Sequence, residues 1–246
     1  MLILDIENAP NLAYVWRLYD ENVSLDLLLK EHYILSWAAK WYGEDEIMFD
    51  SLNQSSRKQM IGRMHKLLNE ADAVIHFNGK KHDIPFLNRE FIEAGLTPPS
   101  PYKQIDLVAT CRNQFKFPSN RLVYVTKALG LGEKVDHEGY PLWIKCINGE
   151  QKAWATMKKY NIQDVQLTEK LYNKVRPWIK NHPNVALHQD DSDACPVCAS
   201  DDFKKSKNYI VTKSLKYPLF QCQDCNSWFR GTVSIGPKAG KKFASV

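Results

Sequence analysis

The stretch LILDIE, residues 2–7, places two carboxylates inside a segment that otherwise has the composition of a buried strand. Side chains alternate between the two faces of a strand, so Asp5 and Glu7 lie on the same face. Two like charges at this spacing repel each other unless a counter-charge is bound, and carboxylate oxygens are preferred ligands of Mg²⁺ and Mn²⁺. The stretch therefore indicates a divalent-cation site. The alternative is that both side chains project into solvent at a sheet edge, which is the more frequent reason for an isolated Asp-x-Glu.

Segments with strand and helix patterns follow in an order that predicts a mixed sheet. β-Branched and aromatic runs predict strands over residues 33–42, 46–52, 73–77 and 105–110. Apolar residues at helical spacing predict helices from Ser55 or Ser56 to Glu70, from Asp83 to Gly95, and over 121–129 and 151–175. Because strands come first and strand–helix alternation follows, we expect an α/β fold with a mixed sheet flanked by helices.

A third carboxylate interrupts the apolar face of the helix expected over 151–175. Met157, Tyr160, Leu167 and Leu171 recur along one stripe of this helix, and Asp164 lies in the middle of it. A buried, unpaired charge is costly, so Asp164 requires a cation or strong hydrogen-bond donors nearby. A structural acid that such donors satisfy is the alternative to a metal ligand.

A fourth carboxylate, Asp83, follows the turn signal Asn78-Gly79 at the start of an expected helix, where an N-cap is the ordinary explanation. The same loop holds Lys80 and Lys81, which face either a phosphate backbone or solvent. Asn78 contacts a substrate or shapes the turn, and we favour the turn because the Asn-Gly pair already accounts for it.

Three segments in this order carry a resemblance to a known family: Asp5-Ile-Glu7, Asn78-Gly-Lys-Lys-His-Asp83 and Tyr160-Asn-Ile-Gln-Asp164. Residues 1–178, including the segments 117–121 and 130–134, resemble the DEDDy 3′ to 5′ exonucleases of the DnaQ-like superfamily, which has the ribonuclease H-like fold. Among them the resemblance is greatest to stand-alone exonucleases related to the proofreading domain of family B polymerases, including those of bacterial viruses. Tyr160 indicates the tyrosine subclass, because the sister class has a histidine where this chain has Lys159. His82 departs from the aromatic or apolar residue usual before the aspartate.

The resemblance implies a metal-dependent 3′ to 5′ exonuclease that releases nucleoside 5′-monophosphates. It implies that Asp5, Glu7 and Asp164 hold one Mg²⁺ or Mn²⁺, that Asp5 bridges to a second ion, and that Asp83 supports the second ion through water. Tyr160 would orient the attacking water and assist its deprotonation. The implied substrate is nucleic acid with a free 3′ end, single-stranded DNA ahead of RNA, and the implied partners include a replication or repair protein.

Four of the six cysteines form two Cys-x-x-Cys pairs, Cys195 with Cys198 and Cys222 with Cys225, and 23 residues separate the pairs. This spacing is typical of a zinc ribbon, in which each pair donates two thiolates to a tetrahedral ion. We therefore expect one structural Zn²⁺. A module of this size has little core, so zinc would contribute much of its folding free energy.

Basic and aromatic residues alternate in the cysteine-containing segment. Positive charge attracts phosphates and exposed rings stack on unpaired bases, a combination that favours single-strand binding. The alternative is that the aromatic residues form the small core of the ribbon, and we expect both. The residues predicted to bind nucleic acid are Asn78, Lys80, Lys81, Lys204, Lys205, Lys207, Trp228 and Arg230.

Composition excludes several classes of protein. With 246 residues, 44% hydrophobic and 25% charged, the chain is neither collagen, coiled coil nor a disulfide-rich mini-protein. Its apolar runs are shorter than a membrane helix, and we expect no signal peptide and no membrane partner. The paired cysteines indicate a reducing compartment, the cytoplasm, or the host cytoplasm if a virus encodes the chain.

Charge divides the chain in two. Residues 1–193 carry 24 basic and 25 acidic side chains, whereas residues 194–246 carry 9 and 3. We expect an exonuclease domain over 1–180, a linker over 181–193, a zinc ribbon over 194–235 and a basic flexible tail over 236–246. The competing functions are a catalytically idle nucleic-acid-binding or docking protein with the same fold, and an endonuclease of that fold.

Overall fold

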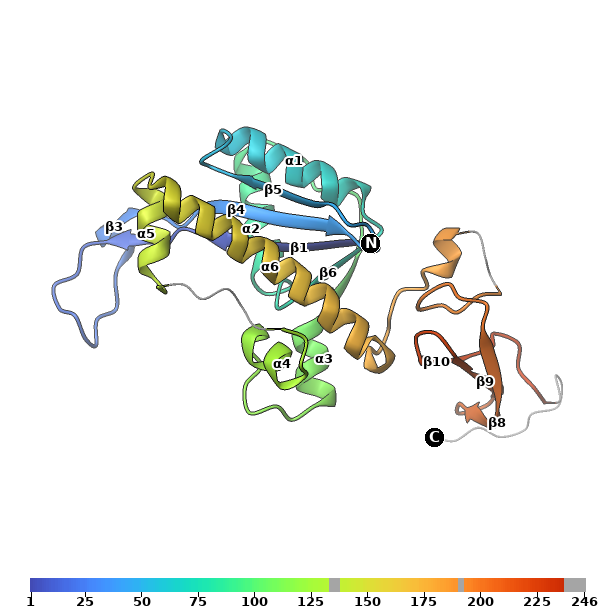
Figure 1. The fold of residues 1–246 in the computed structure, drawn as a ribbon. Coiled ribbons are helices and arrows are strands. Elements are labelled where there is room, and N and C mark those ends of the chain that lie inside the picture. The colour runs from blue at the N-terminus through green and yellow to red at the C-terminus, as the bar shows by residue number, and fades with distance from the viewer. Residues whose placement is uncertain (133–137, 190–192, 237–246) are drawn as a thin grey trace. The chain divides into compact units, whose positions relative to one another are not determined.

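The computed structural model describes residues 1–132, 138–189 and 193–236 (Figure 1). The chain divides into two compact units, Met1–Tyr172 and Asn173–Val246. The domain boundaries expected from the sequence stay predictions. Residues 190–192 of the expected linker and 237–246 of the expected tail lie outside the described residues.

Five strands form the main sheet of the first unit, in the order β5-β4-β1-β6-β7. Their bounds are β1 Leu2–Asn8, β4 Ile34–Trp41, β5 Ile47–Ser51, β6 Ala73–His76 and β7 Lys103–Asp106. β1 pairs antiparallel with β4 and parallel with β6, so the sheet is mixed, as the sequence predicted. Because β1 is the central strand, Asp5 and Glu7 do not lie at an exposed edge of the sheet.

Helices cover both faces of this sheet (Figure 1). α1 (Arg57–Glu70) and α2 (Asp83–Glu93) pack on one face, where Leu4 and Ile6 of β1 meet Met64 and Leu87 in one core cluster. α5 (Pro141–Ile147) and α6 (Gln151–Val175) pack on the other face. Since Leu4 and Ile6 point towards α1 and α2, the alternate carboxylates of β1 point towards α6.

Local capping decides where helices begin. The Ser56 hydroxyl accepts the backbone N–H of Gln59, whose side chain accepts the Ser56 N–H, so α1 begins with a capping box. The strand predicted over 105–110 is wrong beyond Asp106, because α3 (Leu107–Gln114) begins there. The Asp106 side chain accepts the N–H of Val108 at 3.1 Å, and this cap outweighs the strand-like composition of the segment. α4 spans Leu122–Ala128.

An arm with an exposed apolar surface connects β1 to β4. It contains β2 (Leu12–Ala13), β3 (Leu28–Lys30) and the 3₁₀ turn Leu25–Leu27, and its loop extends away from the sheet (Figure 1). The Glu21 carboxylate holds the loop by accepting the backbone N–H groups of Trp16 and Arg17 at 3.1 and 2.5 Å. Its exposed large apolar side chains are Leu12, Tyr14, Val15, Trp16, Leu18, Tyr19, Val23, Leu25 and Leu29.

The second unit contains a three-stranded antiparallel sheet in the order β10-β9-β8. The strands are β8 Phe203–Val211, β9 Lys216–Cys222 and β10 Trp228–Arg230, and 3₁₀ turns cover Arg176–Trp178 and Ala186–Gln189. Phe203, Phe220 and Phe229 contact one another at centroid distances of 5.3 to 5.7 Å. These three rings pack together in the core of the unit. They are among the aromatic residues that we expected to be divided between the core and the surface of the ribbon.

Among the described helices of both units, none has the length and hydropathy to traverse a lipid bilayer.

Candidate active site

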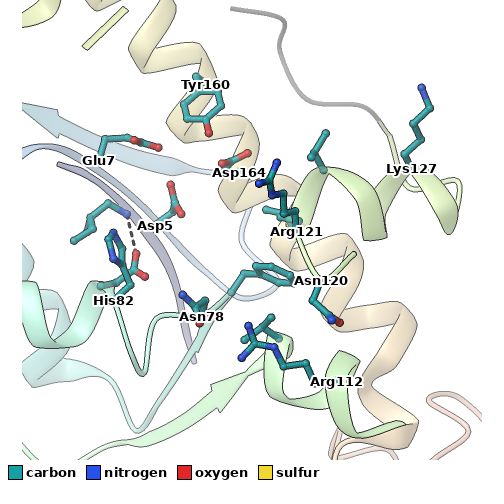
Figure 2. A pocket seen from close by; sticks show the side chains of 16 residues that line it. Asp5, Glu7, Asn78, His82, Arg112, Asn120, Arg121, Lys127, Tyr160 and Asp164 are labelled. Carbon is teal, nitrogen blue, oxygen red and sulfur yellow. Dashed lines mark hydrogen bonds between the residues drawn. The ribbon is translucent and has the colours of Figure 1, made fainter. Parts of the chain in front are cut away.

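Three carboxylates meet where β1 passes beneath α6 (Figure 2). Asp5, Glu7 and Asp164 each offer an oxygen, and these oxygens all lie within 4.8 Å of one another. Asp164 is 4% exposed, so its charge is almost wholly withdrawn from water. Two residues from the first strand and one from the last helix of the unit thus form a single acidic cluster, although 159 positions separate Asp5 from Asp164.

Neighbouring donors orient two of these carboxylates. The side-chain amide of Asn161 donates to Oδ2 of Asp5 at 2.7 Å and to the Asp5 backbone carbonyl at 3.2 Å, while its own oxygen accepts the hydroxyl of Ser36 at 3.0 Å. The indole N–H of Trp143 donates to Glu7 at 3.1 Å. The sequence analysis missed these three supporting residues. Asn161 stands beside Tyr160 in the quoted motif, but nothing in the sequence alone ties Ser36 or Trp143 to the site.

Asp83 lies in the same cleft but outside this cluster of three. It is the first residue of α2, and its Oδ1 accepts the backbone N–H of Ile6 at 3.1 Å. Burial, and to a lesser extent the nearby Asp106 carboxylate, raise the pKa of Asp83, while the backbone N–H groups of Asp83 and Ile6 lower it, and together these effects bring it to about 7. The hydrogen bond to Ile6 fixes the start of α2 against β1, between the two carboxylates of that strand.

The Tyr160 hydroxyl points into the cleft beside Asp164 (Figure 2). Burial raises the pKa of this phenol far above its usual range, and the Asp164, Glu7 and Asp5 carboxylates and a hydrogen bond with Asp164 raise it further. The ring packs edge-on against Trp143 at 5.9 Å between centroids. Tyr160 and Glu7 therefore share a supporting neighbour in Trp143.

The acidic cluster fits a divalent cation by its chemistry. Three carboxylates at this separation repel one another, and each retains oxygens that can coordinate a hard cation such as Mg²⁺ or Mn²⁺. A hydrogen-bond donor alone does not remove the excess of negative charge, because the groups that orient Asp5 and Glu7 are a neutral amide and a neutral indole. The donor set is therefore compatible with a metal centre.

The cleft in front of the carboxylates has a volume of about 890 Å³ and a second, basic side. Arg112 of α3, Asn120 and Arg121 of the segment before α4, and Lys127 of α4 line it together with the acidic residues (Figure 2). None of these four was assigned a site role from the sequence, although Asn120 and Arg121 lie in the segment 117–121, within the span of the resemblance. Only the fold brings them to the carboxylates.

Of the loop residues predicted to contact nucleic acid, only Asn78 lines the cleft. Its φ is +71°, and its backbone N–H donates to Asp106 at 2.9 Å, so it shapes the turn, as we favoured. Lys80 and Lys81 are exposed on this turn and are absent from the cleft lining. His82 lines the cleft, and its ring contacts the Asn8 amide at 3.2 Å.

The four paired cysteines form a second candidate metal centre in the C-terminal unit. One sulfur from each of Cys195, Cys198, Cys222 and Cys225 lies within 4.8 Å of the others. Each pair ends in a tight turn, because Ala199 and Asn226, the residues that follow the pairs, have φ values of +59° and +61°. Four thiols at this separation are compatible with a tetrahedral metal ion. Cys111 and Cys146 are buried elsewhere.

The basic residues predicted in this unit lie at its surface. Lys204, Lys205 and Lys207 are exposed along β8, and Trp228 is 52% exposed on β10. The Arg230 guanidinium lies over the ring of Tyr217 at 4.0 Å, which leaves it at the surface but holds it against this strand pair. These positions are accessible to a polyanion, and their contacts with nucleic acid stay predictions.

A family profile described as the RNase_H superfamily matches residues 30–176. No curated protein matches the chain. Among solved structures, the family B DNA polymerase of the hyperthermophilic archaeon Pyrobaculum calidifontis aligns with 72% of the chain at 16% identity and a TM-score of 0.53.

The chain corresponds to only part of these larger proteins. It spans 24% of the polymerase. RNase D of Trypanosoma brucei aligns with 71% of the chain and 56% of its own length, at 15% identity and a TM-score of 0.45. The polymerase alignment shows a shared fold, and the family match covers more than half of the chain.

Proposed function

The chain belongs to the ribonuclease H superfamily, and from this premise we propose that it is a metal-dependent 3′ to 5′ exonuclease that degrades single-stranded DNA. The observation that carries the proposal is the convergence of Asp5, Glu7 and Asp164 within 4.8 Å at the end of a cleft that also holds Tyr160 and Asp83. Membership of the superfamily supports nuclease chemistry. The direction and the substrate rest on the resemblance of the three motifs to the DEDDy exonucleases.

The proposed reaction is hydrolysis of the last phosphodiester bond of the strand. A water oxygen bonds to phosphorus while the bond from phosphorus to the 3′ oxygen of the preceding nucleotide breaks. The departing oxygen takes up a proton, so the products are a nucleoside 5′-monophosphate and a strand one nucleotide shorter with a free 3′ hydroxyl. Each step leaves the same 3′ terminus, which allows repetition.

Some residues of the site would hold the cations, and others position the carboxylates or the attacking water. Asp5, Glu7 and Asp164 would hold the cation, and Asp83 would support a second one. Mg²⁺ or Mn²⁺ bound there supplies positive charge for the attacking and leaving oxygens. Asn161 and Trp143 hold Asp5 and Glu7 in place. The Tyr160 hydroxyl, in the cleft beside Asp164, orients the attacking water.

The second unit would be a zinc ribbon that grips the substrate. Its four cysteines would bind one Zn²⁺, and its exposed lysines and Trp228 would contact phosphates and bases of the strand. Zinc in this unit has a structural role, because four thiolates leave no open coordination position for a reacting water.

The test uses strands of one sequence in DNA and RNA form, labelled at the 5′ end, incubated with Mg²⁺, with Mn²⁺ or with excess chelator. A ladder that shortens from the 3′ end and disappears with chelator is the expected result, with DNA degraded faster than RNA. Internal cuts would show an endonuclease instead. Intact strands that are nonetheless retarded on a native gel would show a binding protein without catalysis.

A further inference from the structure

The basic side of the cleft has charged and polar groups that the protein itself does not use. Arg112 and Arg121 are both exposed, and neither side chain forms an ion pair or hydrogen bond with any residue of the described ranges. The side-chain oxygen of Asn120 is buried, yet no described donor reaches it. A buried acceptor without a partner is costly, so this side of the cleft is incomplete until a ligand with donor groups enters.

The two sides of the cleft have opposite charge. Asp5, Glu7 and Asp164 line the cleft from β1 and α6, and the two arginines line it from α3 and from the start of α4 (Figure 2). A ligand that satisfies both sides brings an anion to the arginines while another of its groups is held at the carboxylates by a cation. A chain of phosphates has this character, since it offers one anionic group per nucleotide.

The position of the basic side determines which phosphates of the bound strand it can contact. If the carboxylates hold the last phosphodiester of a strand, as under the proposed function, no phosphate lies beyond it on the 3′ side. Any further phosphate in the cleft therefore belongs to a nucleotide on the 5′ side. A cleft of about 890 Å³ is in the size range that holds small ligands, which suits the terminal nucleotides of one strand.

We propose that Arg112 and Arg121 bind the phosphates on the 5′ side of the cleaved bond, and that Lys127 extends this track along α4. This inference rests on the proposed function and adds to it the path of the strand. The guanidinium groups match phosphate oxygens in a two-pronged geometry, and the Asn120 oxygen accepts an N–H from a base between them. The strand then leaves the carboxylates along α3 and α4.

The experiment compares Arg112→Gln and Arg121→Gln with two controls. Arg121→Lys keeps the charge but loses the two-pronged geometry. Lys66→Gln removes one positive charge from α1, where the Lys66 side chain is 79% exposed and outside the cleft lining. The controls separate a specific phosphate contact from a change in the overall charge of the molecule.

The first measurement is binding of a 12-nucleotide single strand in excess chelator, by fluorescence anisotropy over a range of salt concentrations. Each glutamine variant should weaken binding about tenfold and reduce the slope of log affinity against log salt by about 0.7 for each lost phosphate contact. Arg121→Lys should fall between Arg121→Gln and the wild type. A slope equal to that of Lys66→Gln would overturn the proposal.

The second measurement compares two substrates with Mn²⁺ present. The 12-nucleotide strand has phosphates on the 5′ side of the cleaved bond, whereas the p-nitrophenyl ester of thymidine 5′-monophosphate has none. The glutamine variants should lower kcat/KM for the strand about tenfold and leave the ester unchanged. An equal loss on both substrates would place the arginines at the reacting phosphate and reject the track. If the wild type hydrolyses neither substrate, the proposed function fails, while the binding slopes still decide the track.

Discussion

At the scale of single residues, the site is a set of charges whose positions neutral neighbours hold. Asp164 is almost fully buried beside Asp5 and Glu7, and the donors that orient Asp5 and Glu7, Asn161 and Trp143, are neutral groups. Without metal, repulsion between these clustered charges lowers the stability of the fold, whereas activity requires the same charges to bind the metal. We therefore expect that removal of one of these charges lowers activity but does not lower stability in the absence of metal.

Replacing Asp164 with Asn should abolish hydrolysis, with a loss of about 1,000-fold or more, because one cation ligand disappears. In excess chelator the variant should melt at or above the temperature of the wild type, since one of three clustered charges is gone. Mn²⁺ should raise the Tm of the wild type more than that of the variant. The control is Asp45→Asn, an exposed acid outside the cleft. Full activity in Asp164→Asn would contradict the assigned role.

Replacing Asn161 with Ala should lower activity by about 10- to 100-fold, because Asp5 loses the donor that fixes its orientation. The concentration of Mn²⁺ needed for half-maximal rate should rise as well, which a purely structural role would not produce. Ser36→Ala leaves the bond from Asn161 to Asp5 in place and should have a smaller effect. Equal losses in the two variants would show that packing at this point, and not the orientation of Asp5, is responsible.

The pH dependence of stability should contain a contribution from His76. Burial lowers the pKa of His76, against the raising effect of Asp106 and the bond to Gln104, and Lys80 lowers it further. Below the ordinary pKa of about 6.5, the unfolded chain binds a proton that the folded chain excludes, so the free energy of unfolding falls as the pH decreases. Chemical denaturation between pH 5 and 8 should show a shallower fall in His76→Gln. Parallel curves for the two proteins would contradict the assignment.

At the scale of elements, the turn between β6 and α2 depends on close approach between its own residues. Gly79 donates its backbone N–H to the ring of His76 at 3.0 Å, and a Cβ at Gly79 would lie 2.5 Å from the Cγ of that ring. The next element, α2, begins at Asp83. A displaced turn therefore also displaces Asp83, which accepts the backbone N–H of Ile6.

Gly79→Ala should lower the free energy of unfolding by about 1–3 kcal/mol, because the added methyl group overlaps the His76 ring. Gly62→Ala is the matched control. A Cβ there meets nothing within 4 Å, and alanine inside a helix should stabilise α1 by up to about 1 kcal/mol. Urea denaturation monitored by circular dichroism gives both values. Equal stability of the wild type and Gly79→Ala would mean that the turn relaxes without cost.

Elements with a strong local signal could be predicted from the sequence, and elements defined by tertiary contacts could not. β1, α1 and α6 follow from periodicity and a cap, and the mixed sheet follows from their order. The strand expected over 105–110 ends at Asp106, because a single capping bond competes with β-branched composition. α5 spans only Pro141–Ile147, too short a pattern to separate from a loop.

The same division holds for the site. Asp5, Glu7 and Asp164 could be predicted, because a charge in an apolar stretch is visible along the sequence, whereas Asp83 and Tyr160 were predicted through the resemblance of their motifs. Arg112 and Arg121 could not be predicted, since a single arginine, on the short helix α3 or just before α4, has no pattern, and the fold alone brings it to the cleft. The apolar arm between β1 and β4 shows the converse, because its composition suggests burial while Trp16 is 87% exposed.

At the scale of the whole molecule, the two units hold separate candidate metal centres with different ligand chemistry. Hard carboxylate oxygens lie in Met1–Tyr172, and soft thiols lie in Asn173–Val246. The first has a core built from a five-stranded sheet and helices on both faces, whereas the second has one three-stranded sheet and a small core around its cysteines and a few aromatic rings. Loss of metal should therefore unfold the second unit and leave the first unit folded.

Cys222→Ser should release zinc and weaken binding of a long strand, while hydrolysis of the p-nitrophenyl ester of thymidine 5′-monophosphate should change less than twofold, because that chemistry belongs to the first unit. Zinc content by elemental analysis and the two rates provide the measurement. Cys146→Ser, which alters a buried cysteine outside the cluster, should keep its zinc. Unchanged zinc content in Cys222→Ser would reject the ribbon.

The separation of Asp5 and Asp164 along the chain also sets an order of events on the ribosome. Asp164 is added 159 residues after Asp5, which takes roughly 8–30 s at ordinary translation rates. A nascent chain that ends between Glu7 and Asp164 carries only two of the three clustered acids. The complete acidic cluster therefore cannot form until the helix that carries Asp164 has been synthesised.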